Sequence, residues 1–447
     1  VATFLIFWSL SGLLIKIFTS IKSVYYKGVN SFVLRQFCSK INTTVFSTTI
    51  ICLMLFITIS VLSAALSMKN SMSSDLKKMC PVDIQFTKIS YEALKEAYAT
   101  ADKDSDDYEK ATKILEDSKL SISDTLKNNG FDVDEYLKNM TEYSVYQTGL
   151  EEMDTLGILA DEICEKYKMV SFLSHVNFMK LSDYNKIATL YGNETYSLGD
   201  NEYLIVANFK TVADIRNMAL KAGTKIDING KTYCPKYQEC KDGFIELASQ
   251  HINDGIFIVP DDALTDAQVY KCGMTADYKA DSKEEKYDIE NKLDDISKNI
   301  FNQTSYLSYN SKIDLAEASV GLGALVTFIA LYLGIIFLIS SAAILALKEL
   351  SDSADNRERY GMIRKIGVDE KMINMALFKQ IGIFFAFPLL LAIIHSVFGI
   401  KFINLILQTM GMSSMLASVG ITFVFLVVIY GGYFIITYLC SKSIIRP

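Results

Sequence analysis

Long uncharged, apolar runs occupy both ends of the chain and leave a charged stretch between them. Asp and Glu are absent from residues 1–68 and 380–447, whereas a water-soluble chain spreads its acidic residues over its whole surface. About 20 apolar residues cross the hydrocarbon core of a bilayer as a helix. The uncharged runs cover residues 1–15, 41–68, 318–347, 380–400 and 402–441, of which residues 408–414 are too polar for lipid. The pattern therefore predicts five membrane spans, at 1–18, 46–67, 318–347, 376–398 and 417–440.

The alternative, five buried helices of a soluble core, is disfavoured because the runs have no amphipathic stripe. The first run has neither a basic start nor an A-x-A site, so it does not resemble a signal peptide. Since the chain begins with Val1 and not with Met, we expect that the N-terminal part of the protein precedes it.

Lys and Arg in the short connecting segments predict the orientation, because cytoplasmic loops of membrane proteins are rich in these residues. The segment 19–45 carries four basic residues and no acid, and 348–379 carries seven basic residues. The tail, 441–447, has two more, whereas the hairpin 399–416 has only Lys401. We therefore expect 19–45, 348–375 and 441–447 to be cytoplasmic, and the hairpin and residues 68–317 to be extracellular.

The long segment from Lys69 to Glu317 has 45 acidic and 29 basic residues, a net charge of −16. Its patterns are mixed, so the predicted fold class is a membrane all-α helical bundle of five spans with a large extracellular α+β domain. Alternation predicts a strand at 81–89, and Asn229-Gly230 predicts a hairpin over 225–233. The other predicted elements are a helix at 106–129, a strand at 255–259 and a helix at 287–300.

Few residues in the chain point to an enzyme. His175, His251 and His395 are far apart, and the sequence contains no H-E-x-x-H, G-x-S-x-G or paired C-x-x-C. It also has no G-x-x-x-x-G-K-[ST], so we expect no nucleotide site on this chain. We likewise expect no metal and no cofactor on it. For Cys234 and Cys240, a bridge and two free thiols are equally compatible with the spacing.

The segment 348–369 combines dense mixed charge with apolar residues and two glycines. Such a segment can extend a membrane helix, turn, and lay a short helix on a partner, and Gly361 and Gly367 are the natural turning or close-contact points. An ordinary cytoplasmic loop that satisfies the charge asymmetry is the simpler interpretation. The residues alone leave both interpretations open.

The pattern Arg357-Glu358-Arg359-x-Gly361-x-Ile363-Arg364-x-Ile366-Gly367 resembles the signature loop of the FtsX-like permease family of ABC transporters. Within that family, the chain is most similar to the bacitracin- and peptide-antibiotic-resistance (Bce-type) permeases. Residues 30–36 and 39–42 resemble the stretch before the helix that leads to their external domain, and 181–185 resembles a stretch within that domain. The order of one helix, a large external domain and three helices also agrees. These permeases have ten spans, so the chain resembles their C-terminal half to two-thirds.

The resemblance implies a permease subunit that works by transmitting force. A separate cytoplasmic ABC ATPase dimer would bind ATP and dock on the loop, and membrane helices and external domain would move together. The residues implied in this ATPase coupling are Arg357, Glu358, Arg359, Gly361, Arg364 and Gly367. The implied location is the bacterial cell membrane, with a multi-pass chain in the lipid bilayer and a cytoplasmic C-terminus.

The implied role is resistance to, and sensing of, antimicrobial peptides such as bacitracin. The other implied partners are a membrane histidine kinase and a cationic peptide or lipid-linked cell-wall precursor complex; no nucleic acid is expected. Two alternatives stay open: a transmitter that does not transport but controls a cell-wall hydrolase or a sensor kinase, and extraction of lipoproteins or lipids.

Two features of the spans suit force transmission. The third run has 30 uncharged residues, which as one helix would be about 45 Å long against a hydrocarbon core of about 30 Å. It could therefore project as a stalk, with Gly321, Gly323, Ala330 and Gly334 allowing close approach of a neighbouring helix. Pro388 is expected to kink the fourth span.

Overall fold

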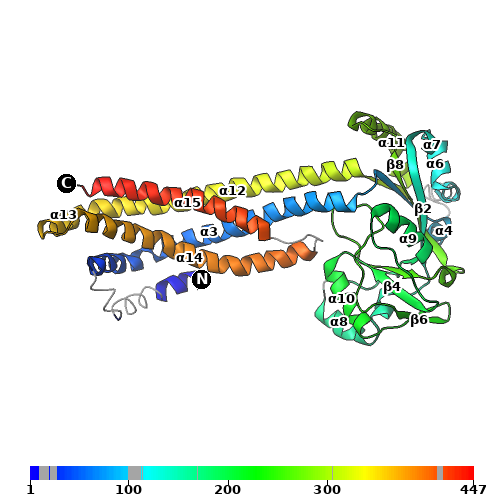
Figure 1. The fold of residues 1–447 in the computed structure, drawn as a ribbon, viewed down its shortest axis with the longest axis horizontal. Coiled ribbons are helices and arrows are strands. Elements are labelled where there is room, and N and C mark those ends of the chain that lie inside the picture. The colour runs from blue at the N-terminus through cyan, green and yellow to red at the C-terminus, as the bar shows by residue number, and fades with distance from the viewer. Residues whose placement is uncertain are drawn as a thin grey trace. The chain divides into compact units, whose positions relative to one another are not determined.

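The computed structural model describes residues 1–9, 20, 28–98, 112, 114–168, 170–304, 306–409 and 416–446 (Figure 1). These residues form two compact units. The first comprises the described residues within Val1–Asn70, Gly323–Ile406 and Ser413–Pro447. The second comprises those within Ser71–Leu322 and Leu407–Met412.

Long apolar helices build the first unit. They are α3 (Asn30–Met79), α12 (Lys312–Asp355), α14 (Glu370–Thr409) and α15 (Leu416–Ile444), and the short α13 (Arg357–Lys365) follows α12. Among the described residues, four helices are long and apolar enough to cross a membrane: Thr44–Met79, Lys312–Asp355, Glu370–Gln408 and Ser418–Ile444. The first predicted span, 1–18, lies partly outside the described residues, so a total of five spans stays a prediction.

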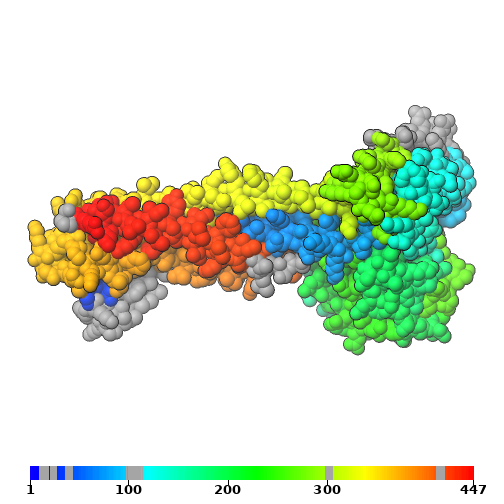
Figure 2. Space-filling model, turned by 45° about the horizontal axis from the view of Figure 1, so that its top comes forward, coloured from blue at the N-terminus to red at the C-terminus, as the bar shows by residue number. Residues whose placement is uncertain are grey.

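The helices of the first unit bury one set of apolar residues and expose another. Leu55, Leu377 and Phe385 belong to its core, whereas Phe328 and Val428 are 71% and 67% exposed. Exposed apolar side chains on a helix of this length are suited to lipid. A helix also pairs its own backbone N–H and C=O groups, as a lipid environment requires. Figure 2 shows α15 and the adjoining stretch of α12 along the surface of this unit.

Small residues bring helices together, although only partly at the predicted positions. A Cβ at Gly334 would lie 3.5 Å from Thr58, and one at Gly323 would lie 3.9 Å from Lys69, so both glycines face α3. The prediction for Gly321 was wrong as far as the described residues go, because a Cβ there would meet none of them within 4 Å. The tightest approach was not predicted: a Cβ at Gly399 of α14 would lie 2.7 Å from Phe56 of α3.

Two helices run further than hydropathy predicts. The third run lies inside the 44-residue α12, since the charged residues that flank it continue the helix. The predicted hairpin at 399–416 is helical as far as Thr409, because Phe402–Leu407 keep the apolar character of α14. The same helix continues through Pro388, so the chain is not interrupted there, and the kink stays a prediction.

The second unit is built on a nine-stranded mixed sheet with strand order β5-β6-β4-β7-β3-β2-β8-β1-β9 (Figure 1). Most neighbours are antiparallel, while β3–β7 and β4–β6 are parallel. The strands are β1 (Ile84–Ile89), β2 (Leu137–Gln147), β3 (Phe178–Lys180), β4 (Glu202–Val206), β5 (Ile226–Ile228), β6 (Lys231–Pro235), β7 (Ile256–Val259), β8 (Gln268–Tyr278) and β9 (Leu307–Ser311). The helices are α4 (Tyr91–Tyr98), α6 (Ile122–Asn128), α7 (Val133–Tyr136), η1 (Glu152–Leu159), α8 (Ala160–Lys166), α9 (Leu181–Tyr191), α10 (Lys210–Lys221), η2 (Asp261–Leu264) and α11 (Lys283–Thr304).

These elements confirm the α+β prediction in most places. The predicted hairpin is β5–β6, with φ of +50° at Asn229 and +79° at Gly230, as a type I′ turn requires. One continuous helix at 106–129 was wrong: the described part breaks after residue 118, and Ser121 then caps α6 by accepting from the backbone N–H of Asp124. Residues 106–111 and 113 lie outside the described residues. Cys234 and Cys240 are free thiols, so the structure contains no bridge between them.

Candidate functional site

The segment that carries the sequence motif folds as a helix–turn–helix corner in the first unit. α12 continues to Asp355, α13 follows at once, and α14 begins at Glu370. The corner lies at the surface at one end of that unit (Figure 2). We call residues 356–370 the α13 corner. The predicted course of an extended membrane helix, a turn and a short helix is therefore present.

A buried aromatic side chain fixes α13 to its neighbours. Tyr360 is 1% exposed, and its hydroxyl donates to Oε1 of Gln380 on α14 at 3.0 Å. Its ring meets the ring of Phe32 on α3 edge to face, with centroids 5.4 Å apart. A buried tyrosine usually needs a partner for its hydroxyl, and here that requirement fixes the rotation of α13 about its axis. The other side of α13 consequently faces outward.

The outward side of α13 combines charges with two apolar side chains. Arg357, Glu358 and Arg359 are exposed, as the resemblance implies for residues that meet a partner. Met362 and Ile366 are 55% and 82% exposed. Sequence reasoning missed these two residues as candidates, although their spacing of four residues on a helix indicates one face. Arg and Met are enriched at protein interfaces, and an apolar centre with a charged rim is the usual composition.

Arg364 points back into the chain and not outward. Its Nη1 donates to the backbone carbonyl of Ile445 at 2.7 Å, and its Nε bonds Oε1 of Glu370. The side chain is only 18% exposed. Arg364 thus joins α13 to the start of α14 and to the C-terminal end of α15. A cation at that place suits the unpaired carbonyls that end a helix.

The two glycines of the motif differ. Gly367 has φ of +92°, a conformation that favours glycine, and it turns the chain between α13 and α14. The expectation that Gly361 turns the chain or makes a close contact was wrong within this chain. It lies inside α13, and a Cβ there would meet no atom of the described part of the chain within 4 Å.

Buried acids lie behind the α13 corner. Glu349 and Asp352 are 0% and 9% exposed, and Asn356, the N-cap of α13, is 2% exposed. They recur at three- and four-residue spacing, so they share one face of the end of α12. The spacing of these polar residues in the sequence indicates a shared helix face. Counting basic and acidic residues, which predicts a cytoplasmic loop, does not indicate that face.

Within the part of the chain that the structure describes, no group of three or more His, Cys, Asp or Glu is placed to hold a metal ion. The α13 corner offers a surface on which a partner could lie. Its parts are one fixed helix, an outward mixed face and a clamp to α15.

Comparison with known proteins places this chain beside ABC transporter permeases. No family model matches the chain. It is 31% identical over 93 residues to the ABC transporter permease protein YxdM of Bacillus subtilis, which is 21% of this chain and 15% of that protein. It is 34% identical over 92 residues, 20% of this chain and 14% of that protein, to the bacitracin export permease protein BceB of the same species. For BceB of Halalkalibacterium halodurans, the identity is 28% over 105 residues, 23% of this chain and 16% of that protein.

The matched region thus spans only about 15% of the length of these relatives. The four apolar helices among the described residues agree with a multi-pass membrane protein. Over about a fifth of its length, the chain is similar to ABC transporter permeases, among them bacitracin export permeases.

Proposed function

We propose that this chain is part of the permease subunit of an ABC transporter that acts in resistance to, and sensing of, bacitracin-like antimicrobial peptides. The observation that carries the proposal is the similarity to two bacitracin export permeases. In this proposal, ATP is bound and hydrolysed on a separate ATPase dimer. The second unit lies outside the bacterial cell membrane, and the α13 corner and the C-terminus lie in the cytoplasm.

The mixed outward face of α13 is the proposed contact with the ATPase. Arg357, Glu358 and Arg359 would supply charged contacts, and Met362 and Ile366 would supply the apolar centre. Because Tyr360 and Arg364 fix α13 to α3, α14 and α15, a push on this short helix would reach those helices without bending a flexible loop. Arg364 and Gly367 then act as positioning residues for α13 and not as the contact itself.

Drug sensitivity tests the proposed role. The gene is inactivated in the source bacterium, and growth is measured in bacitracin, nisin and an unrelated control antibiotic. We expect the strain to become sensitive to at least one peptide antibiotic and to regain resistance from a wild-type copy, with no change towards the control drug. Unchanged sensitivity to every peptide tested would overturn the proposal.

A further inference from the structure

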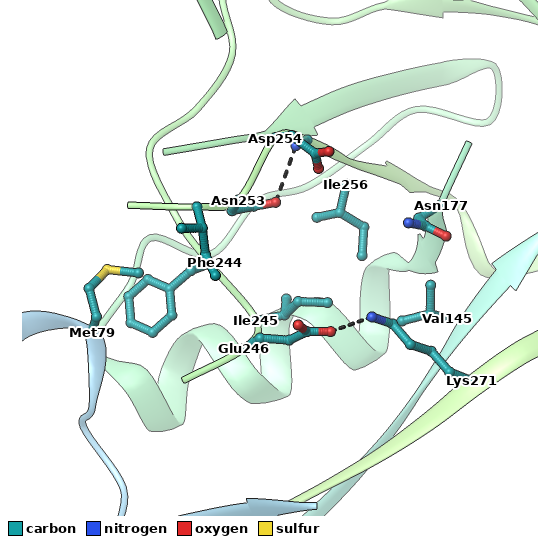
Figure 3. Close-up of a pocket in the computed structure, with 12 residues that line it drawn as sticks. Met79, Val145, Asn177, Phe244, Ile245, Glu246, Asn253, Asp254, Ile256 and Lys271 are labelled. Carbon is teal, nitrogen blue, oxygen red and sulfur yellow. Dashed lines mark hydrogen bonds and ion pairs between the residues drawn. The ribbon is translucent and has the colours of Figure 1, made fainter. Parts of the chain in front are cut away.

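A small pocket lies in the second unit, beside the sheet. It has a volume of about 110 Å³. Buried apolar side chains form its floor, namely Met79, Val145, Phe244, Ile245 and Ile256. Figure 3 shows Met79 and Phe244 on one side of the pocket and Val145 with Asn177 on the other. An apolar cavity of about 150 Å³ can hold benzene, so this volume suits one branched aliphatic side chain.

The mouth of the pocket is polar and slightly acidic. Lys271 pairs with Oε1 of Glu246, and Asp254 adds a second carboxylate, so the lining has one more negative than positive charge (Figure 3). Ile252 also lines the pocket and is 57% exposed. Ile252 thus adds an apolar contact at the mouth to those of the buried floor.

The loop that forms this mouth is preformed. Asn253 donates from Nδ2 to the carbonyls of Val206 and Gly243 at 3.0 and 2.9 Å. Gly255 has φ of +136°, and a Cβ there would lie 2.6 Å from Nε of Arg216, which itself donates to the carbonyl of Asp254 at 2.7 Å. A ligand therefore meets a fixed loop and need not order one, which lowers the cost of binding.

The pocket also touches the end of a long helix. Met79 is the last residue of α3, the helix that contains the candidate span Thr44–Met79. One turn earlier in α3, Asp75 lies 3.3 Å from Nε2 of His251, which directly precedes Ile252 in the mouth loop. The floor and the mouth of the pocket are thus both fixed to the last turns of α3.

We propose that this pocket binds an aliphatic side chain of a positively charged peptide, and that the bound side chain packs against Met79 at the end of α3. The apolar floor selects the side chain. The acidic mouth, and the net charge of −16 between Lys69 and Glu317, select basic neighbours and raise the rate of encounter at low salt. The class of ligand rests on the proposed function, whereas the pocket and its contact with α3 do not.

Binding of three short peptides to the full-length chain in nanodiscs of zwitterionic lipid tests the proposal. The probes are N-acetyl-Lys-Ile-Lys-amide, its Gly analogue and its Glu-Ile-Glu analogue. Full burial of an Ile side chain strengthens binding by a factor of at least about ten in the dissociation constant. The Gly analogue should therefore bind at least about tenfold more weakly. The Glu-Ile-Glu analogue should bind more weakly at low salt. Equal binding of all three peptides, or no binding of the first, would overturn the proposal.

Two variants and one signal locate the binding. Ile252→Ser should weaken binding of the Lys-Ile-Lys peptide several-fold. Ile158→Ser, at a more exposed aliphatic residue that does not line the pocket, should leave that binding unchanged. With ¹³C-methyl methionine, the Met79 methyl signal, assigned by Met79→Leu, should shift with the Ile peptide and not with the Gly peptide. An unmoved Met79 signal at saturation, or equal effects of both Ser variants, would exclude this pocket.

The test separates this proposal from the proposed function. Ile252→Ser should leave co-purification of the ATPase at the wild-type level, because the variant is remote in sequence from the α13 corner. Peptide binding without any drug resistance would overturn the proposed function and leave the pocket. Drug resistance without peptide binding would overturn the pocket proposal and leave the proposed function standing.

Discussion

Arg364 gives the sharpest structural prediction, because it joins three helices through one side chain. Its Nη1 donates to the carbonyl of Ile445 at 2.7 Å, and its Nε bonds Glu370, whose side chain is 56% exposed. A hydrogen bond from a charged donor contributes about 1.5–3 kcal/mol, whereas the pair with exposed Glu370 adds little. Arg364→Ala should therefore lower the local stability of the end of α15 by about 2 kcal/mol.

Hydrogen exchange on the full-length protein in detergent measures this effect. A loss of about 2 kcal/mol speeds exchange through local opening roughly 30-fold, and the change should be confined to peptides from α13 and from residues 438–446. Arg359→Ala is the matched control, since Arg359 lies exposed on the same helix. Exchange at the end of α15 that is the same in both variants would refute the clamp. That result would also favour the alternative that Arg364 lies on the outward face and contacts the ATPase directly.

Three further predictions concern other parts of the chain. Arg216→Ala should destabilise the second unit by about 3–5 kcal/mol in chemical unfolding, because it leaves the largely buried Glu152 without its cation at 2.8 Å; a loss below about 1 kcal/mol would contradict this. Burial raises the pKa of the Glu290 carboxyl from 4.5 to about 7, so the folded state binds this proton more tightly than the unfolded state does. The stability of the folded state therefore falls as the pH rises from about 4.5 to about 7. Glu290→Gln should remove this loss, seen as slower hydrogen exchange in α11 at pH 8 but not at pH 5; an equal effect at both pH values would refute it. In single-cysteine variants, native Cys234 should react with an impermeant maleimide on intact cells and Asp355→Cys only after permeabilisation, and the opposite result would reverse the topology.

The four long apolar helices among the described residues were predictable from the sequence, because hydrocarbon excludes charge over a fixed thickness. The ends of these helices were not predictable from hydropathy, since a helix can continue into water through charged residues. α12 therefore includes charged residues on both sides of its apolar run, and α14 extends beyond Lys401. In the second unit, Asn229-Gly230 predicted a hairpin because positive φ is a local requirement. The place of β8 between β1 and β2 depends on pairings between distant segments, which local patterns do not encode.

The candidate site also has features that the sequence predicted and features that it did not. The motif gave the position of the α13 corner, and Gly367 was predictable as a turn. The inward course of Arg364 was not, because its acceptor lies 81 residues further along the chain. Glycine at 361 suggested a turn, yet the residue lies within a helix whose outward side is open. The pocket in the second unit was equally hidden, because its lining comes from six separated places in the sequence, at 79, 145, 177, 244–246, 252–256 and 271.

Co-purification of the ATPase with the full-length chain tests the central claim most directly. The variant carries Glu358→Arg and Arg359→Glu, which exchange two exposed charges without a change in net charge. Lys371→Glu, at an exposed residue of α14 close to the corner, is the control. At equal expression in the membrane, the double variant should lose the ATPase together with resistance to bacitracin-like peptides, while the control keeps both. Full recovery of the ATPase and full resistance with the double variant would contradict coupling through α13.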